Sequence, residues 1–471
     1  MNWKSRLQSH KLYTALVCVT VLTSILMLIS FEYIDVDSIT AWSLNFWDLL
    51  FRGRLDEFYQ YAAENLRGAD YPNCSGNYLW LLPVCIWNFP LWVVHRICGI
   101  MSVHYFFSLC WTKLFWLFAQ IVTALTCRKI CLMLMGNGNR GVAENTGILA
   151  FLLVMASPEI MLSTGYAGQD EIIYICLFML AFYEYLCEKW RKCYLLMIGC
   201  VSLCPIMLLP CIALFLLKEK NIVKLLGLTV GTMVPTVLFE FLYRNDAIYQ
   251  VVKQRHDFGS LIIDFFSEYR IMPETNELSY SLIALLILYF VCYTTKKRGE
   301  EDQRKTVFMM ALAFFIICYL MEQDFYRMFL WVPFFVVLVL TSKQNRNMNL
   351  FLLSVLTFGR AVYMCQAGWT YKYVLNTKYV MPWLKGLCGR ENDTCMWDYL
   401  CNFFEGDYWV ILRLTLLAVP NIIMASTILL LVINRPNFKN QYDIAIPAKV
   451  SVILYTCCMP LLMLAFCFML F

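Results

Sequence analysis

The chain has 471 residues, of which 61% are hydrophobic and only 15% charged, and its formal net charge is +5. The mean hydropathy of +0.61 excludes an ordinary soluble enzyme and is typical of a polytopic membrane protein. The sequence contains neither a basic patch interleaved with aromatic residues nor a glycine-lysine phosphate loop. Nucleic acid is therefore not an expected partner, and an ATP-driven pump is disfavoured.

Apolar segments of about 17–25 residues recur along the chain, the length needed to cross about 30 Å of hydrocarbon as a helix. They predict an all-α polytopic membrane protein with about 11–13 transmembrane helices. The first segment follows a basic N-terminus and lacks a small-residue cleavage site, so we predict an uncleaved anchor. The segments lie at residues 12–31, 104–127, 143–160, 170–187, 222–242, 279–296, 305–321, 326–341, 347–366, 409–432 and 449–470.

Lysine and arginine collect in short loops, which the positive-inside rule places in the cytoplasm together with the N-terminus. This orientation requires that Trp80–Val94, which contains Pro83 and Pro90, lies on or re-enters the outer membrane face without crossing. It also requires that Cys193–Leu217, broken near Cys204-Pro205, forms a hairpin that returns to the cytoplasm. The basic loops are the N-terminus, Arg128–Arg140, Lys189–Lys192, Lys218–Lys224, Lys296–Lys305, Lys343–Arg346 and Arg435–Lys439.

The predicted outer face consists of a layer of loops and short helices. It contains residues 32–103, a turn near 161–170, and residues 243–278 and 367–408. We divide the chain into a module over 1–345 and C-terminal transmembrane helices over 346–471. Most of the 22 cysteines lie in apolar segments, where a free thiol behaves as a small hydrophobe. In the last outer loop, Cys388 and Cys395 could form a disulfide or remain free thiols.

An acidic cluster follows the first apolar segment, on the predicted outer face: Asp35, Asp37 and Asp48. We treat Asp48 as a candidate residue for binding the donor or the acceptor. If the chain is extended there, Asp35 and Asp37 point to one side and can share a proton, a metal ion or a substrate hydroxyl. A carboxylate held partly out of bulk water is suited to act as a general base. The alternative is that these residues are only the polar end of a helix.

A second polar group, Gln169, Asp170 and Glu171, opens the segment after the turn near 161–170. The positive end of the helix dipole favours acids there, and a helix cap would explain Asp170 alone. Burying all three at a membrane boundary is costly unless they meet a ligand or partners. We therefore treat them as candidate substrate-binding residues.

A third group lies in the short outer turn at residues 321–328, where Tyr326 and Arg327 are candidate donor-binding residues. A guanidinium can hold a phosphate through two parallel hydrogen bonds, although pairing of Arg327 with Asp324 or Glu322 is an equal alternative. Arg360 lies inside a later apolar segment and is a further candidate by its position, with snorkelling as the alternative.

The order of these features resembles the GT-C superfamily of integral-membrane glycosyltransferases, particularly bacterial mannosyltransferase and arabinosyltransferase types. The resemblance covers roughly residues 10–345 and is one of layout. It includes acid after the first helix (Asp35, Asp37), Tyr71-Pro72 before Asn77–Trp80, Gly168–Glu171, the proline-broken hairpin from Cys204-Pro205 to Pro210, and Phe325-Tyr326-Arg327.

The resemblance implies that the protein transfers a sugar from a polyprenyl-phosphate-linked donor to a glycan, lipid or protein acceptor on the outer face of the cell membrane. Asp35 or Asp37 would be the general base, and the arginine of the late turn would hold the donor phosphate. No cofactor is certain, although Asp35 and Asp37 are compatible with magnesium or manganese. The remaining partner is membrane lipid.

Two other functions stay open. A lipid-linked glycan flippase usually has repeated halves and charges within its spans, and no internal repeat is evident in this sequence. A polysaccharide polymerase or ligase would show paired arginines in large outer loops. The third outer segment offers only Arg244, Arg255 and Arg270.

Overall fold

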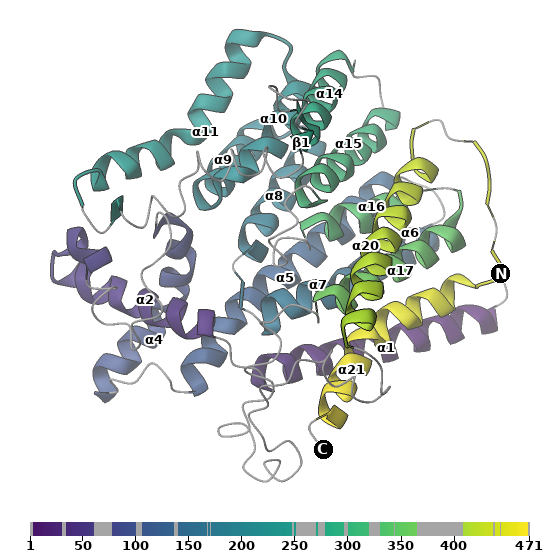
Figure 1. Ribbon diagram of the computed structural model, residues 1–471, viewed down its shortest axis with the longest axis horizontal. Coiled ribbons are helices and arrows are strands. Elements are labelled where there is room, and N and C mark those ends of the chain that lie inside the picture. Colours follow the sequence, from purple (N-terminus) through teal and green to yellow (C-terminus); the bar gives the residue numbers. More distant parts are fainter. Residues whose placement is uncertain are drawn as a thin grey trace.

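The computed structural model is nearly all helical (Figure 1). Five of the described helices are long and apolar enough to cross a membrane, which indicates a membrane protein: Lys11–Ile29, Leu79–Cys98, Phe107–Met135, Gly141–Gly165 and Ile222–Tyr243. The prediction of an all-α polytopic chain is confirmed at this level. The structure describes residues 3–30, 34–60, 78–99, 106–135, 140–166, 168–169, 171–246, 249–250, 270–271, 278–295, 300–319, 330–342, 344–364, 408–436, 439–442 and 444–469.

The elements follow one another in the order shown by the colours of Figure 1. The strands β1 (Arg270–Ile271) and β2 (Leu278–Ser279) form a short antiparallel pair. The helices are α1 Trp3–Ser30, α2 Ile34–Phe51, η1 Leu55–Glu57, η2 Tyr78–Leu81, α4 Leu82–Cys98, α5 Phe106–Met135, α6 Arg140–Met155, α7 Pro158–Ile160, η3 Met161–Tyr166, α8 Glu171–Leu186, α9 Trp190–Leu203, η4 Pro205–Met207, α10 Leu208–Lys218, α11 Ile222–Tyr243, α14 Tyr280–Thr294, α15 Glu300–Tyr319, α16 Val332–Thr341, α17 Arg346–Met364, α20 Tyr408–Ile433 and α21 Ala448–Met469.

Helix α16 lies at the centre of the bundle, and every one of its residues is buried. A helix that is apolar on all sides satisfies its whole surface only inside a protein or in lipid. Here protein surrounds it, since α16 packs on α5, α6, α15 and α17. Phe334 stacks on Phe314 of α15, with ring centroids 4.5 Å apart, and contacts Phe178 and Phe182 of α8 edge-on.

Helices α2 and α4 pack on the N-terminal half of α5 and form a group at one end of the molecule (Figure 1). Asn88 of α4 joins all three helices, because its Nδ2 donates to Ser43 Oγ at 2.7 Å and to Thr112 Oγ1 at 3.0 Å. Thr40 Oγ1 also donates to Thr112 Oγ1, at 2.9 Å. We call Thr40, Ser43, Asn88 and Thr112 the neutral junction. It gives buried polar groups partners where the helices meet.

From the sequence we predict that the residues of α2 lie in an outer loop and that two prolines interrupt the segment that forms α4. The structure differs on both points, since α2 is a regular helix and α4 runs through Pro90. Pro83 fits because the first turn of a helix needs no N–H donor there. At 17 residues, and with η2 before it, α4 is long enough for a crossing, so proline alone does not make it a surface helix.

The predicted break at Cys204-Pro205 is confirmed, because α9 ends at Leu203 and η4 begins at Pro205. The end of α10 lies close to the start of α9, so α9 and α10 are the two arms of a hairpin. The ring of Trp190, at the start of α9, lies 6.0 Å from that of Phe215, near the end of α10. Tyr194 also contacts Phe215, at 6.1 Å. The two arms therefore form a hairpin whose ends lie on the same side of the bundle, as the sequence predicted.

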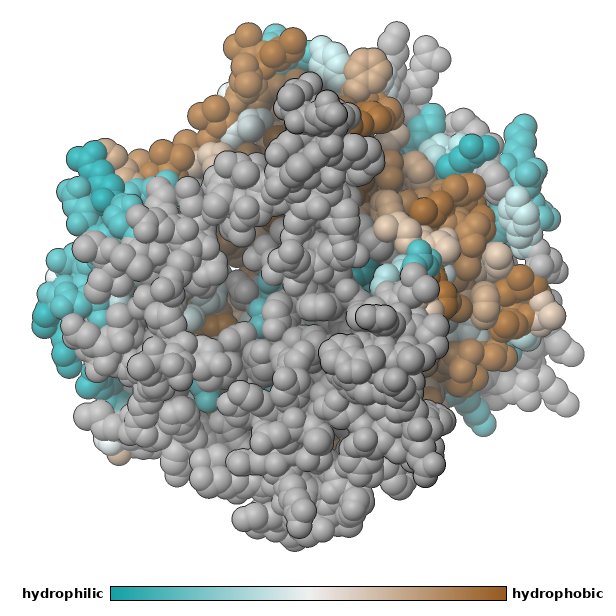
Figure 2. All heavy atoms as spheres, viewed as in Figure 1, coloured by the Kyte–Doolittle hydropathy of each residue, from teal (hydrophilic) through white to brown (hydrophobic). Residues whose placement is uncertain are grey.

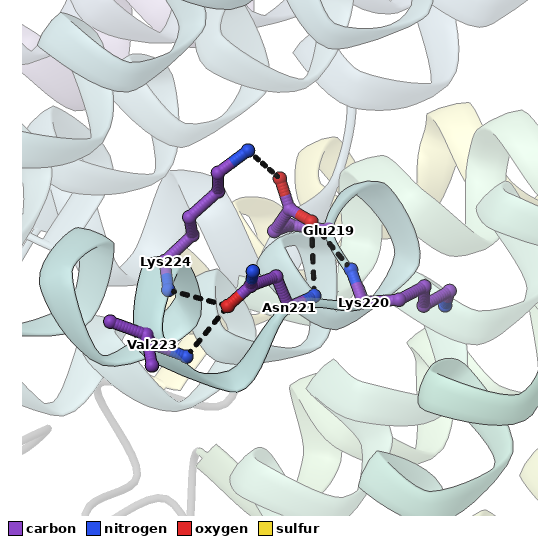
Figure 3. A network of polar contacts seen from close by, with 5 residues as sticks. All are labelled: Glu219, Lys220, Asn221, Val223 and Lys224. Carbon is purple, nitrogen blue, oxygen red and sulfur yellow. Dashed lines mark hydrogen bonds and ion pairs between the residues drawn. The ribbon is translucent and has the colours of Figure 1, made fainter.

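A compact network of polar contacts shapes the linker between α10 and α11 (Figure 3). Glu219 Oε1 accepts from the backbone N–H groups of Lys220 and Asn221, both at 3.0 Å. Asn221 then caps α11, since its Oδ1 accepts from Val223 N at 3.0 Å and Lys224 N at 3.3 Å. These bonds supply partners for the first N–H groups of a helix, which have none within it.

Helix α11 presents a long apolar surface to the outside of the bundle, which Figure 2 shows as brown spheres over this helix. Lipid is the medium that suits such a surface. The exposed side chains are Ile222, Val223, Leu226, Val230, Val234, Val237, Leu238, Phe241 and Leu242.

The C-terminal helices pack directly on the first module, α21 against α1 and α6, and α17 against α7 and α16. Helix α17 also packs against α20 and α21. Asn349 and Asn434 exchange amide hydrogen bonds of 2.9 Å, and Ser354 Oγ donates to Ser451 O at 2.8 Å. The division at residues 345 and 346 stays a prediction. Cys388 and Cys395 lie outside the described residues.

Candidate functional site

The helix over residues 140–166 is interrupted within the bundle, and proline explains where. Helix α6 ends at Met155, and Pro158 lacks the N–H that would bond the carbonyl of Val154 four residues earlier. Gln120 of α5 takes its place, donating from Nε2 to Val154 O at 3.4 Å and Met155 O at 3.1 Å. An α5 side chain thus satisfies the backbone at the break.

The same face of α5 also contacts the π-helix η3, which is the second irregular stretch in the helix over residues 140–166. Lys113 lies seven residues, or two turns, before Gln120 and is only 3% exposed. Its Nζ donates to Gly165 O at 2.8 Å, near the C-terminal end of η3. A cation stabilises the negative end of a helix, and the buried carbonyl there needs a donor. π-helical turns are frequent at functional sites.

A small cavity of about 20 Å³ lies where α1, α5 and η3 meet, room for about one water molecule. Ser24 and Thr164 reach it with hydroxyls that donate to carbonyls in their own helices, at 2.9 Å and 2.6 Å. The lining residues are Ser24, Met27, Leu28, Lys113, Leu117, Gln120, Met161, Thr164 and Gly165.

The segment after η3 touches the start of α2. Gly168 has a left-handed backbone with φ of +66°, and a Cβ added to it would overlap Val36 Cγ2 and lie 3.3 Å from Trp116. Only glycine fits such a conformation at such close packing. Gln169 N donates to Ser163 O at 2.9 Å and continues the turn. The structure therefore brings the start of α2 into contact with the segment that precedes α8.

Asp37 lies one residue after Val36 and is half-buried, with one carboxylate oxygen fully buried. The expectation of an extended segment is wrong, because Asp35 and Asp37 are the second and fourth residues of α2. Residues two apart in a helix do not share a face, so the backbone does not pair these two aspartates. The side chain of Asp35 lies outside the described residues.

Gln169 is half-buried, and Glu171, which opens α8, is 5% exposed. Both lie directly after the Gly168 contact. The side chain of Asp170 lies outside the described residues, as do Tyr326 and Arg327. We define the candidate site as Asp37, Gln169 and Glu171.

Asp48 belongs to a different part of α2. Its Oδ1 accepts from Trp92 Nε1 at 2.6 Å and from Arg96 Nε at 2.9 Å, and it forms an ion pair with Arg96. It follows Asp37 by eleven residues, about 16 Å along a helix. Asp48 thus fastens α4 to α2 and lies apart from the candidate site.

Arg360 is also apart from the candidate site. It is 1% exposed on α17 and interacts electrostatically with Glu159 of α7, whose side chain is completely buried. Tyr455 of α21 approaches Ser157 and Thr357 without hydrogen bonds of normal geometry, and it also interacts with Glu159. We call Ser157, Glu159, Thr357, Arg360 and Tyr455 the charged cluster. Such burial does not fit snorkelling, which keeps the charged head in water.

Three buried residues escaped the sequence interpretation, namely Lys113, Gln120 and Glu159. Each lies within an apolar segment whose mean hydropathy conceals a single polar residue. The available signal was the presence of a charge inside a span, because such residues are costly and usually have partners. Gln120 carried no comparable signal, since its role depends on the break in a neighbouring helix.

Among the residues that the structure describes, no three histidine, cysteine or acidic side chains converge as a metal site. No protein-family model, curated protein or solved structure matches the chain.

Proposed function

We propose that this chain is an integral-membrane glycosyltransferase of the GT-C type that transfers a sugar from a polyprenyl-phosphate-linked donor to an acceptor on the outer face. The observation that carries the proposal is the packing of Val36 against Gly168. It places the start of α2, with Asp37, beside the segment that contains Gln169 and Glu171.

Asp37 is the proposed general base. A base that takes a proton from a hydroxyl acceptor must lie partly out of bulk water yet within reach of substrate. A half-buried carboxylate in the first turn of α2 meets the first condition. Gln169 and Glu171 would position the acceptor hydroxyls through hydrogen bonds, and Arg327 remains the proposed ligand of the donor phosphate.

A magnesium or manganese ion shared by Asp35 and Asp37 is not part of this proposal. Positions two apart in a helix diverge, and divalent cations need oxygen ligands that converge.

The proposed topology has about 11–13 crossings, a cytoplasmic N-terminus and the site on the outer face. Two contacts between helix ends agree with the sides that it assigns. The hairpin of α9 and α10 keeps two lysine-rich loops on one side. The C-terminal end of α11 contacts the first outer segment, since Tyr243 Oη donates to Leu55 O at 3.0 Å. Residues near 55 and 243 thus share a side, as the proposed topology requires.

The test is transfer of radiolabelled sugar from polyprenyl-phosphate monosaccharides in membranes that contain equal amounts of each variant. Asp37→Asn should lower the rate by about 10²–10⁴-fold, the usual contribution of a general base. Asp56→Asn is the matched control, because Asp56 is an exposed acid of the same outer segment. Asp35→Asn decides between the two aspartates. Undiminished transfer by Asp37→Asn, or no transfer by the unaltered chain with any donor, would contradict the proposal.

A lipid-linked glycan flippase is the second candidate, and one observation favours it. Four charged side chains are buried in the described bundle: Lys113, Glu159, Glu171 and Arg360. Transporters characteristically carry such charges near interrupted helices, and the helix over residues 140–166 is interrupted. Movement of a fluorescent lipid-linked oligosaccharide across proteoliposomes, undiminished in Asp37→Asn, would favour this function over sugar transfer and over a polymerase or ligase.

A further inference from the structure

The charged cluster joins three helices at a place that the candidate site does not include. Glu159 comes from α7, Arg360 from α17 and Tyr455 from α21. The three side chains are respectively 0%, 1% and 2% exposed, so all three are shielded from the surface.

The carboxyl group of Glu159 lacks the contacts that a permanent carboxylate requires. Neither of its oxygens has a hydrogen-bond partner among the described residues, and Arg360 acts on it only electrostatically. Attraction between buried charges offsets the loss of hydration only when hydrogen bonds join them directly. A carboxylic acid has a smaller requirement, namely one acceptor for its O–H.

The Tyr455 hydroxyl is the oxygen nearby that could accept a hydrogen bond from the protonated carboxyl group of Glu159. Tyr455 interacts with it, and Tyr455 in turn approaches the hydroxyls of Ser157 and Thr357. Among the described residues, Cys458 of α21 also interacts electrostatically with Glu159. A metal cation is a poor occupant, because the guanidinium of Arg360 would repel it.

The backbone around Glu159 is not part of a continuous helix. Helix α7 has only three residues, between the break at Pro158 and the π-helix η3. Ser157 caps it weakly, with its Oγ 3.5 Å from Ile160 N. From α7 the chain continues through Gly165, which lines the cavity, to Gly168, which packs against Val36 at the start of α2.

We propose that Glu159 is an exchangeable proton-binding site inside the membrane, with Arg360 as its counter-charge and the Tyr455 hydroxyl as the acceptor that its O–H would use once protonated. In the binding step one O–H bond forms on a Glu159 carboxyl oxygen. The proton comes from hydronium, which leaves as water, and the charge of the cluster rises by one. No oxidation or reduction accompanies the step.

The test is infrared difference spectroscopy of the full chain in lipid nanodiscs, titrated from alkaline to acidic pH in H₂O and in D₂O. We expect a carbonyl band of a protonated carboxyl group that grows as the pH falls and shifts in D₂O. Glu159→Gln should remove this band. Glu171→Gln, a change at another buried carboxyl, should retain it. Glu159→Asp should move the band without removing it, and this variant keeps the proposal testable if glutamine disturbs folding.

Arg360→Gln provides a second, independent measurement. Without the nearby cation the carboxylate loses its stabilisation, so the band should persist at pH values at which the unaltered chain has lost it. The proposal is overturned if Glu159→Gln removes no band at any pH at which the protein stays folded. It is equally overturned if the band that it removes does not change with pH. In either case the cluster would be a fixed structural contact.

Discussion

The neutral junction and the charged cluster are both buried polar groups that join three helices, yet they are built differently. In the neutral junction the polar side chains are uncharged and linked by hydrogen bonds of 2.7–3.0 Å. In the charged cluster an acid and a guanidinium interact electrostatically, and the carboxyl oxygens of Glu159 have no hydrogen-bond partner among the described residues.

The difference shows that burial alone does not distinguish a structural contact from a functional one. A neutral group with partners costs little in an apolar environment, and it fixes the packing of helices. Burying a charge that has no direct partner costs a large amount of free energy. The neutral junction is therefore suited to hold α2 and α4 on α5, and the charged cluster is suited to change its state.

Arg360→Met should have the largest effect on stability. Breaking a buried charge pair costs about 3–5 kcal/mol, because the remaining charge is left uncompensated. If Glu159 then takes up a proton, the cost should be smaller at acidic pH. Thermal unfolding in detergent at several pH values measures both. Arg52→Met, at an exposed arginine, is the control and should change little. A loss of stability equal at every pH would argue against proton uptake.

Gly168→Ala should cause the second largest loss of stability, because it disturbs the contact on which the candidate site depends. The left-handed conformation costs an alanine about 1–2 kcal/mol, and overlap with Val36 adds about 1–3 kcal/mol. Gly53→Ala separates the two effects, since Gly53 has φ of +69° but no atom within 4 Å of an added Cβ. Sugar transfer should fall in the first variant alone. Equal behaviour of the two variants would mean that Val36 and Gly168 are not tightly packed.

Asn88→Ala should destabilise the chain less than Arg360→Met does. Hydrogen bonds between membrane helices contribute about 0.6–1.7 kcal/mol, and Ser43 and Thr112 retain bonds to carbonyls of their own helices. The same unfolding measurement, made at neutral and acidic pH, should show a small loss that does not depend on pH. A larger loss than that of Arg360→Met would reverse the comparison.

The smallest effect is expected at the linker of Figure 3, where the side chain of Glu219 is partly exposed at the surface. Hydrogen bonds from Asn221 and Lys220 lower the pKa of Glu219 below its ordinary value of 4.5, and Lys224 adds to this. The stabilisation is thus present above the unfolded pKa and disappears as the pH falls through the lower folded value. Hydrogen exchange of the Lys220 and Asn221 amides, corrected for intrinsic rates, should accelerate there. Glu219→Gln should show no such transition.

The apolar segments and the break at Pro205 were predictable, because hydropathy and proline act locally. The contact of Gly168 with Val36 was not, since it joins distant segments and a glycine in a turn has many uses. The acids of α2 were misinterpreted as part of a loop. A helix begins readily with acids in its first turn, because the dipole favours them there, and the periodicity of the following residues was the better signal.

The candidate site was predictable only in part. Asp37, Gln169 and Glu171 were identified by their residue types at predicted helix ends, and the structure brings their segments together. Asp48 has the same residue type but is bound by Trp92 and Arg96, which sequence position does not reveal. Glu159 and Lys113 were hidden because the mean hydropathy of a segment conceals one charge among many apolar residues.

The enclosed position of α16 has a consequence for how the protein is made. Of the helices that surround α16, α5, α6 and α15 precede it in the chain, but α17 follows it. Synthesis proceeds from the N-terminus, so α16 is complete before one of its walls exists. Its open side must first be covered by lipid or by the insertion machinery, and that cover must leave when α17 docks. Truncation after residue 345 should therefore leave α16 accessible to lipid-soluble photolabels that cannot reach it in the complete chain.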